Sequence, residues 1–335
     1  IPGLNYRTQR YKESYDQLPQ NLILGSETAS TVSSRGVYKF PVEDKKSTKY
    51  DDHQCSSYDV EACSWSNIPD EDFALADDNH WTIGLFVWTG FDYLGEPSPY
   101  DTDAWPYRSS MFGIIDLASL PKDRYYLYRS VWNKDAETLH ILPHWTWPGR
   151  EGEVTPVFVY TNYPTAELFI NGKSYGKQSK NNRSLKNRYR LMWMDAVYEP
   201  GEVKVVAYNK EGKAVAEKVV RTAGKPHHIE LVSNRNELTA DGKDLAYVTV
   251  KVVDKDGNLC PTDNRQINFS AKGTGKYRAA ANGDPTNLEQ FHLPKMHAFN
   301  GMLTAIIQAG ETAGEIVFTA KANGVKAGNI RIQTK

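Results

Sequence analysis

The feature that most constrains the fold is a short apolar run that ends on a carboxylate. Residues 22–24 are Leu-Ile-Leu, and Gly25-Ser26-Glu27-Thr28 follows at once. An unbroken apolar triplet is typical of a strand covered on both faces in a parallel sheet. In a barrel of parallel strands the carboxyl ends form the active-site face, so the pattern predicts that Glu27 is a catalytic group. The alternative is a solvated loop carboxylate.

A second apolar run, residues 81–91, ends in the same way. It delivers Trp88, Asp92 and Tyr93 to one rim, and Gly95-Glu96-Pro97 then turns the chain away. An aromatic floor beside a carboxylate suits a sugar, whose C–H face stacks on rings while its hydroxyl groups bind charged acceptors. The alternative for Trp88 is an ordinary core position.

Several motifs together resemble one enzyme family. They are Gly25-Ser26-Glu27-Thr28, Ser33-Ser34-Arg35-Gly36, and the stretches 87–97, 112–117 and 121–126. They resemble the closing third of the catalytic barrel in glycoside hydrolase family 2, and they are most similar to the β-galactosidase-like enzymes of Bacteroidetes. The resemblance continues more weakly through the rest of the chain.

The resemblance implies a retaining glycoside hydrolase, most directly a β-galactosidase that acts on non-reducing terminal β-galactosides. A β-glucuronidase and a β-mannosidase are alternatives within the same family. Glu27 would be the nucleophile and Trp88 the floor of the sugar subsite. The family also implies a periplasmic or extracellular location, although no signal peptide is visible at the N-terminus.

Four further residues are candidates for substrate binding. A nucleophile must stay ionised, so Glu27 needs hydrogen-bond donors or a cation nearby, and Tyr6 and Arg35 are the candidates. A packed loop tyrosine and a structural ion pair are the respective alternatives. Asp92 or Glu96 would bind hydroxyl groups or brace the loop.

The composition excludes several classes of function. The net charge is −1 over 335 residues, which argues against a nucleic-acid partner, because phosphate binding relies on clustered positive charge. No run approaches the roughly 18 apolar residues of a membrane helix. Cys55, Cys63 and Cys260 are too few for a disulfide framework or a zinc site, so we expect free thiols, no metal and no cofactor.

The N-terminal part alternates these apolar runs with helical patterns. Helices are expected over residues 9–18, 68–79 and 125–132, with the first ending at Pro19. Residues 43–59 are expected to form a long loop over the active-site face. From this loop His53, Tyr58 and Asp59 could touch substrate, although solvated loop residues are the favoured interpretation.

The character of the chain changes after Trp132. Short apolar strands separated by turn signals, such as the hairpin signal Asn171-Gly172, predict β-sandwiches. We therefore predict a multidomain α/β plus all-β chain. Residues 1–135 would be the C-terminal part of a (β/α)8 barrel, and residues 136–223 and 224–335 would be two immunoglobulin-like sandwiches. Both sandwiches are expected to fold without the barrel portion.

The acid/base of the reaction is not found among the candidates. In the resembled family it is a glutamate in an Asn-Glu pair, and that pair occurs here only as Asn236-Glu237, in the last predicted domain. A barrel takes about 250 residues, so the chain is expected to lack the part that bears the acid/base and to be inactive when isolated. Its expected partners are the carbohydrate substrate and either the missing N-terminal part of the same enzyme or a second copy of the chain.

A competing hypothesis makes the sandwiches carbohydrate-binding or cell-surface interaction modules. It requires exposed aromatic platforms, and Trp145, Trp147 and Trp193 are the residues to inspect. For the first two, packing at a domain junction is the favoured alternative. A lyase or a transferase on the same barrel is a third option, because the fold does not fix the chemistry.

Overall fold

The computed structural model describes residues 1–46, 49–96 and 105–335. The chain divides into two compact units. The first comprises Ile1–Asp116 and Pro121–Arg221, and the second comprises Leu117–Leu120 and Thr222–Lys335. The described residues form mostly strands and few helices, as predicted. The division after Arg221 lies close to the predicted boundary at residue 223, and the boundary at residue 135 stays a prediction.

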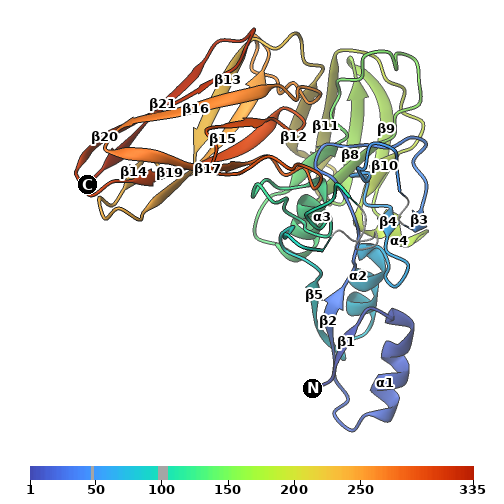
Figure 1. The fold of residues 1–335 in the computed structure, drawn as a ribbon. Helices are drawn as coiled ribbons and strands as arrows, with labels where there is room; N and C mark the ends of the chain where they lie inside the picture. Colours follow the sequence, from blue (N-terminus) through green and yellow to red (C-terminus); the bar gives the residue numbers. More distant parts are fainter. Residues whose placement is uncertain (47–48, 97–104) are drawn as a thin grey trace. The chain divides into compact units, whose positions relative to one another are not determined.

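The first unit begins with a sheet of three parallel strands. They are β1 (Gly3–Asn5), β2 (Ile23–Thr28) and β5 (Thr82–Val87), in the order β1-β2-β5. In Figure 1 these strands run side by side, with helices beside them. Because parallel neighbours need a crossover connection, the chain must return along the sheet between each pair of strands.

Helices make these crossovers. A single 3-10 turn, η1 (Thr8–Arg10), and α1 (Tyr11–Gln17) join β1 to β2. The helix α2 (Pro69–Asp78) precedes β5, and α3 (Asp123–Trp132) follows it. The three helices predicted from the sequence are therefore confirmed. α1 stops before Pro19 because Leu18 is extended, and α2 starts with a proline at its first position, where the missing N–H costs nothing.

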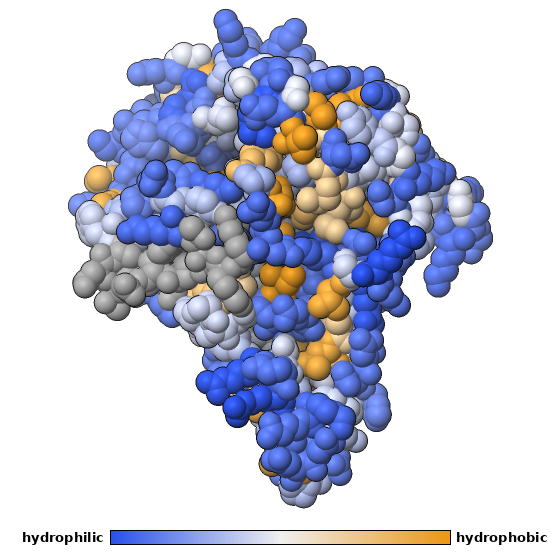
Figure 2. All heavy atoms as spheres, turned by 90° about the vertical axis from the view of Figure 1, so that its right-hand side faces the viewer, coloured by the Kyte–Doolittle hydropathy of each residue, from blue (hydrophilic) through white to orange (hydrophobic). Residues whose placement is uncertain are grey.

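Both apolar runs are covered only in part among the described residues. Ile23 is buried, but Leu22 is 36% exposed, Ile83 is 47% exposed and Phe86 is 62% exposed. The helices that follow the strands cover one face of the sheet and leave apolar side chains on the other. Figure 2 shows apolar patches among the mostly hydrophilic side chains of one side of the molecule.

Two antiparallel sheets complete the first unit and form a β-sandwich. One sheet has the order β10-β7-β6 and consists of β6 (Leu139–Leu142), β7 (Val157–Thr161) and β10 (Leu191–Trp193). The other has the order β12-β11-β8-β9 and consists of β8 (Thr165–Ile170), β9 (Lys173–Ser179), β11 (Glu202–Tyr208) and β12 (Ala214–Arg221). Asn171 and Gly172 both have positive φ, which confirms the predicted hairpin between β8 and β9.

Short elements link the sandwich to the N-terminal part. The strands β3 (Lys45–Lys46) and β4 (Glu61–Ala62) pair in parallel, and α4 (Leu185–Tyr189) precedes β10.

The second unit is a sandwich of its own. Its first sheet has the order β13-β15-β19-β17, from β13 (His228–Ser233), β15 (Leu245–Val253), β17 (Gly275–Ala281) and β19 (Met302–Ala309). Its second sheet has the order β14-β21-β20-β16-β18, from β14 (Glu237–Leu238), β16 (Gln266–Gly273), β18 (Lys295–His297), β20 (Gly314–Lys321) and β21 (Gly328–Thr334). Strict alternation along β20 buries Ile316, Phe318 and Ala320 in the core, as period-2 patterning requires.

The first sandwich shares a hydrophobic core with the N-terminal part. Tyr58, Phe73 and Leu127 pack in one cluster with Phe158 and Tyr160 of β7. The Tyr58 hydroxyl also donates a hydrogen bond of 2.6 Å to the carbonyl of Pro156. Separating the two parts would expose these rings, each worth roughly 1.5–3 kcal/mol on burial. This shared core argues against the expectation that the first sandwich folds without the N-terminal part, which stays a prediction.

A buried ion pair crosses the same junction. Arg190, just before β10, is 1% exposed and forms a two-point contact with the fully buried carboxylate of Asp70 on α2, with Nε 3.1 Å from Oδ1. Burying two charges is tolerated only when each satisfies the other and the remaining donors are used. Arg190 also donates to the carbonyl of Tyr58 at 3.4 Å, so its contacts run across the junction in two places.

Replacing Arg190 with Met is expected to lower the free energy of unfolding of the first unit by about 3–5 kcal/mol, because Asp70 is left as a buried charge without a counterion. Arg188→Met is the matched control. Arg188 pairs with Asp77 and Asp78 at the surface, and its loss is expected to cost less than about 1 kcal/mol. All 8 tryptophans lie in the first unit, so urea unfolding followed by tryptophan fluorescence reports on that unit. Equal losses in the two variants would contradict the prediction.

Candidate active site

The carboxyl ends of the three parallel strands bring Tyr6, Glu27 and Trp88 to one edge of the sheet. Tyr6 directly follows β1, Glu27 lies near the end of β2, and Trp88 directly follows β5. Backbone hydrogen bonds fix their relative positions: the Tyr6 N–H donates to the Glu27 carbonyl at 2.8 Å, and the Trp88 N–H donates to the Thr28 carbonyl at 2.9 Å. The sequence pattern therefore led to residues that the fold does bring together.

The Glu27 carboxylate ends a chain of hydrogen-bond donors. The Tyr6 hydroxyl donates to Glu27 Oε2 at 3.0 Å, and the Ser30 hydroxyl donates to the Tyr6 oxygen at 2.8 Å. The Ser30 N–H in turn donates to Ser66 Oγ at 2.8 Å. Burial raises the pKa of Tyr6, so its proton stays on the oxygen and remains available for donation. Donation to a carboxylate favours the ionised form, which is the form that a nucleophile needs.

The backbone at Tyr6 is unusual. Tyr6 and Arg7 have φ values of 53° and 51°, which place two consecutive non-glycine residues in the left-handed region. A bulky residue adopts this conformation rarely, because its Cβ crowds the following carbonyl oxygen at a cost of about 1–2 kcal/mol. Tyr6 is held there from both ends, by its N–H and by its hydroxyl, both of which bind Glu27. Such strain persists where the surrounding structure over-determines it, and it is common at functional sites.

Trp88 lies half-buried at the same edge. Its ring meets the ring of Tyr93 edge-on at 5.9 Å, and both rings pack against a cluster that includes Met111 and Phe112. The peptide bond that joins Trp88 to Thr89 is cis. The Tyr93 hydroxyl donates to the carboxylate of the exposed Glu96. Glu96 thus lies beside Tyr93.

Asp92 occupies a different place from the one predicted for a sugar-binding carboxylate. It is 5% exposed, its Oδ1 accepts the Gly113 N–H at 2.8 Å, and its Oδ2 lies 2.7 Å from Lys122 Nζ. Burial raises the pKa of Asp92 to about 6, although Lys122 opposes this shift. A Cβ at Gly113 would lie 2.2 Å from the Asp92 nitrogen, so only glycine fits this contact. The geometry corrects the substrate-binding assignment in favour of the alternative, a brace for the loop.

Arg35 is likewise placed as a structural residue. It is 6% exposed, and its Nε donates to the buried carboxylate of Asp116 at 2.6 Å. Of the two roles that the sequence left open, the structure shows the ion pair.

Two buried cations that sequence reasoning overlooked hold the loops around the site. Lys122 Nζ donates to the Ser33 carbonyl at 2.7 Å in addition to its contact with Asp92. Arg124 donates to the carbonyls of Thr31, Phe112 and Gly113. Both lie in the stretch 121–126, so the sequence signal for them was present in the motif itself.

The loop 43–59 differs from the prediction of solvated residues. Tyr58 and Asp59 are fully buried, and Asp59 accepts a hydrogen bond of 2.8 Å from the Tyr160 hydroxyl of β7. Neither side chain can reach a substrate.

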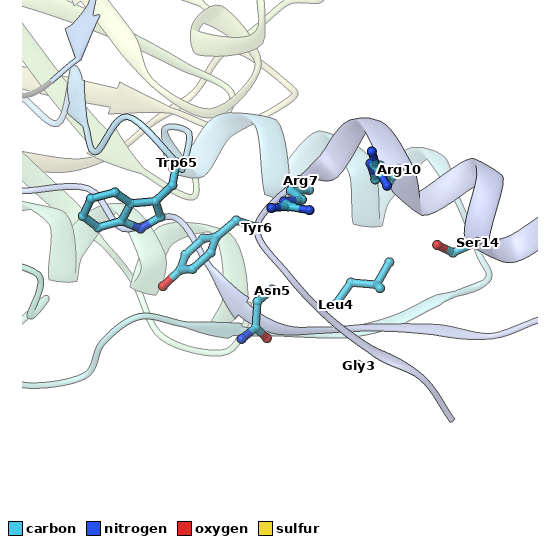
Figure 3. A pocket seen from close by; sticks show the side chains of 8 residues that line it. All are labelled: Gly3, Leu4, Asn5, Tyr6, Arg7, Arg10, Ser14 and Trp65. Carbon is cyan, nitrogen blue, oxygen red and sulfur yellow. The ribbon is translucent and has the colours of Figure 1, made fainter.

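A pocket of about 640 Å³ opens beside the strand ends, and Figure 3 shows its lining. It is lined by Gly3, Leu4, Asn5, Tyr6, Arg7, Arg10, Ser14 and Trp65. Trp65, which sequence reasoning missed, is 46% exposed. The only signal for it was a lone tryptophan in a polar loop that follows the strand bearing Glu27.

The tryptophans proposed as sandwich platforms are not exposed. Trp145 and Trp193 are 0% and 1% exposed. Trp147 stacks on His144 at 4.0 Å and contacts Tyr38 and Phe40 of the N-terminal part. Burial lowers the pKa of His144 to about 3, so this stack is uncharged at neutral pH. These residues pack the interior and the junction.

In the ranges described, no group of three or more His, Cys, Asp or Glu side chains is arranged to hold a metal ion. None of the helices in those ranges combines the length and the apolar character that crossing a bilayer requires. The three cysteines are free and buried, as predicted.

Comparison with known proteins gives matches along the whole chain. Residues 229–331 match glycoside hydrolase family 2 C-terminal domain 5, and residues 152–216 match a domain of unknown function, DUF4982. The β-galactosidase BoGH2A of Bacteroides ovatus is 40% identical over 344 positions, which cover 100% of this chain and 39% of that protein. A putative β-glucuronidase of Formosa agariphila is 36% identical over 62% of this chain and 20% of its own length.

A solved structure matches equally far. The crystal structure of a β-glycosidase from Bacteroides vulgatus has a TM-score of 0.86 and 28% identity, covering 99% of this chain and 44% of that one.

These observations define a modular protein. Two β-sandwiches follow an α/β portion whose central parallel strand carries the carboxylate of Glu27. The chain carries C-terminal domains of glycoside hydrolase family 2, and the resemblance found in the sequence is confirmed. It spans about two fifths of the length of the Bacteroides ovatus β-galactosidase and of the Bacteroides vulgatus β-glycosidase.

Replacing Lys122 with Met is expected to destabilise the first unit by about 3–5 kcal/mol at pH 7.5, because Asp92 is then buried without its cation. The loss should be smaller at pH 5. The folded pKa of Asp92 is about 6 with Lys122 present and rises further when this cation is removed, so the extra cost of charging Asp92 in the variant builds up only as the pH rises above about 6. Urea unfolding at both pH values measures this difference.

Two further variants test the cause. Adding Asp92→Asn to Lys122→Met should restore part of the stability and remove the pH dependence. Lys39→Met breaks a pair with the exposed Asp52 and should cost less than about 1 kcal/mol at either pH. A Lys122 loss that does not vary with pH would show that Asp92 is not its source.

Proposed function

We propose that this chain is the nucleophile-bearing part of a retaining glycoside hydrolase and that Glu27 attacks the anomeric carbon of a terminal β-galactoside. The observation that carries the proposal is the 3.0 Å hydrogen bond from the Tyr6 hydroxyl to Glu27 at the carboxyl end of parallel strands. The Glu27 carboxylate is supplied with a donor but is only half-buried, so it still reaches solvent, as attack on a substrate requires.

The three parallel strands are interpreted as the last strands of a (β/α)8 barrel. Each is followed by a helical segment, and the order of the strands in the sheet is their order in the chain, as in a barrel. The exposed side chains of Ile83 and Phe86 would then be covered by the rest of the barrel. Preceding residues of the same enzyme would supply that cover, and a second copy of this chain is the alternative.

The proposed chemistry is a double displacement. A Glu27 oxygen bonds to the anomeric carbon as the glycosidic C–O bond breaks, and a general acid protonates the leaving oxygen. Water, deprotonated by the same group, then attacks the anomeric carbon and returns the electron pair of the ester bond to Glu27. The acid/base would lie about 5–5.5 Å from Glu27. We assign it to residues outside this chain, since Glu237, of the Asn-Glu pair, lies in β14 of the second unit and contacts Lys335 there.

Trp88 is proposed as the floor of the sugar subsite, with Glu96 at its rim. A β-galactoside is the favoured substrate because the relative that matches the whole chain at 40% identity is named a β-galactosidase. β-Glucuronides and β-mannosides are the alternatives. Relatives named β-glucuronidase match at 36% identity over 62% of the chain and at 23% over 80%.

The first test is covalent trapping in the longer enzyme that contains this chain. A 2-deoxy-2-fluoro-β-galactosyl fluoride should label Glu27, and Glu27→Gln should abolish the label. Tyr6→Phe should slow labelling by roughly 10- to 100-fold, because a hydrogen bond to a charged group contributes about 1.5–3 kcal/mol. Tyr15→Phe is the control, since that residue stacks on Trp81 away from Glu27. Peptide mapping that finds the label on another residue would overturn the assignment.

The second prediction is that the chain by itself does not turn over aryl β-galactosides or β-glucuronides. It holds the proposed nucleophile without the acid/base, and general acid–base catalysis supplies about 10²–10⁴-fold of the rate. The assay uses the purified 335-residue chain. Enzyme-like turnover that disappears in Glu27→Gln would place an acid/base within these residues.

A further inference from the structure

We propose that the pocket beside Tyr6 is the leaving-group subsite of this enzyme. Trp65 would stack on the sugar ring of the leaving group, and Arg7 would bind an acidic substituent on it, a carboxylate or a sulfate ester. The inference rests on the proposed role of Glu27 and adds the class of sugar on the far side of the scissile bond.

The pocket begins next to the proposed nucleophile. Tyr6 forms part of its wall, and the hydroxyl of the same residue binds Glu27 Oε2 at 3.0 Å. A molecule in the pocket therefore lies one side chain away from Glu27. Figure 3 shows Trp65 and Tyr6 at one end of the pocket, Arg7 between Tyr6 and Arg10, and Arg10 and Ser14 toward the other end. The end with Trp65, at the carboxyl end of β1, is the part that a leaving group would enter.

Trp65 is exposed but its loop is fixed. The Cys63 N–H donates to the Ser30 carbonyl at 3.0 Å, and the Ser66 N–H donates to the Cys63 carbonyl at 3.0 Å. Ser66 Oγ also accepts the Ser30 N–H at 2.8 Å, so the loop is tied to the strand end on both sides of Trp65. An indole that is 46% exposed on a fixed loop presents a rigid apolar surface of the kind on which a sugar ring packs.

The charge of the pocket selects the ligand. Its lining contains two arginines and no acidic residue. Among the described residues, the guanidinium group of Arg7 has no hydrogen bond or ion pair, and its left-handed backbone fixes where the side chain leaves the wall. A planar guanidinium binds carboxylate and sulfate groups through two parallel hydrogen bonds. A uronate or a sulfated sugar therefore fits better than a neutral one.

Reactivation of the trapped enzyme tests the subsite directly. After 2-fluoro-galactosyl fluoride has esterified Glu27, an acceptor sugar in the subsite attacks the anomeric carbon through a hydroxyl oxygen. The ester C–O bond breaks with its electron pair returning to Glu27, and the hydroxyl proton passes to the acid/base carboxylate of the longer enzyme. Acceptors that bind the subsite speed the recovery of activity, whereas the trapping step itself uses a fluoride leaving group that is too small to need it.

Three acceptors separate stacking from charge: methyl α-glucoside, methyl α-glucuronide and methyl α-glucoside 6-sulfate. In the native enzyme the two acidic acceptors should reactivate faster than the neutral one. The acidic acceptor that reactivates the enzyme faster shows whether the subsite prefers a carboxylate or a sulfate ester. Trp65→Ala should slow reactivation by all three by about tenfold and leave trapping unchanged, while Trp65→Phe should keep most of the effect. Arg7→Gln should remove only the advantage of the acidic acceptors.

Two matched controls complete the design. Trp132→Ala removes a tryptophan of similar exposure, 47%, at the end of α3, and Arg183→Gln removes an exposed arginine that does not line the pocket. Both should behave as the native enzyme. Unchanged acceptor rates in Trp65→Ala, or equal effects of Arg7→Gln and Arg183→Gln, would overturn the inference while Glu27 labelling stands. A native enzyme that is not labelled on Glu27 would overturn the proposed function together with the subsite.

Discussion

The arrangement of the candidate site depends on three buried cations that bind loops rather than substrate. Lys122 joins Asp92 to the Ser33 carbonyl, and Arg124 donates to carbonyls after β2 and after β5. Arg190 joins α2 to the first sandwich through Asp70. Loops cannot bury their carbonyl groups without donors, and each cation supplies several donors from one side chain. Long loops at the strand ends can therefore be fixed without regular secondary structure.

Contacts of the same kind join the first sandwich to the N-terminal part within one compact unit. Tyr160 lies on β7, and Arg190 lies just before β10. The Tyr160 hydroxyl donates to Asp59, and Arg190 donates to Asp70, so both side chains have their partners in the N-terminal part. Removing that part would leave a buried guanidinium and buried rings facing water. The sandwich serves as the support on which the loops after β2 are held, and so it contributes to the position of the candidate site even though it supplies no residue to it.

The sequence allowed the local structure to be predicted well. The helices, the hairpin at Asn171-Gly172 and the strand ends that carry Glu27 and Trp88 all follow from periodicity and turn chemistry, which are local properties. Partners that are distant in sequence could not be predicted in the same way. Asp92 was assigned to substrate because it follows a strand, and Arg35 was a candidate cation for Glu27, but their partners, Lys122 and Asp116, are brought in by the fold.

The same limit applies to burial and to single residues. Tyr58 and Asp59 lie in a polar stretch that reads as a solvated loop, and they are buried only because β7 packs on them. Trp65 belongs to no periodic pattern, so nothing in its neighbourhood distinguished a platform from a packing residue. The left-handed backbone at Tyr6 and Arg7 was equally hidden, because neither residue type favours that conformation.

The three carboxylates near the strand ends differ in a way that bears on the choice of nucleophile. Asp92 is buried, both of its oxygens are engaged, and its pKa is raised to about 6, so at mildly acidic pH it loses the charge that attack requires. Glu96 is exposed, and water competes with the Tyr93 hydroxyl for hydrogen bonds to its carboxylate. Glu27 is half-buried and receives a donor that is itself polarised by Ser30. Of the three carboxylates, only Glu27 combines a positioned donor with partial exposure, so it can be oriented by the protein and still meet a substrate.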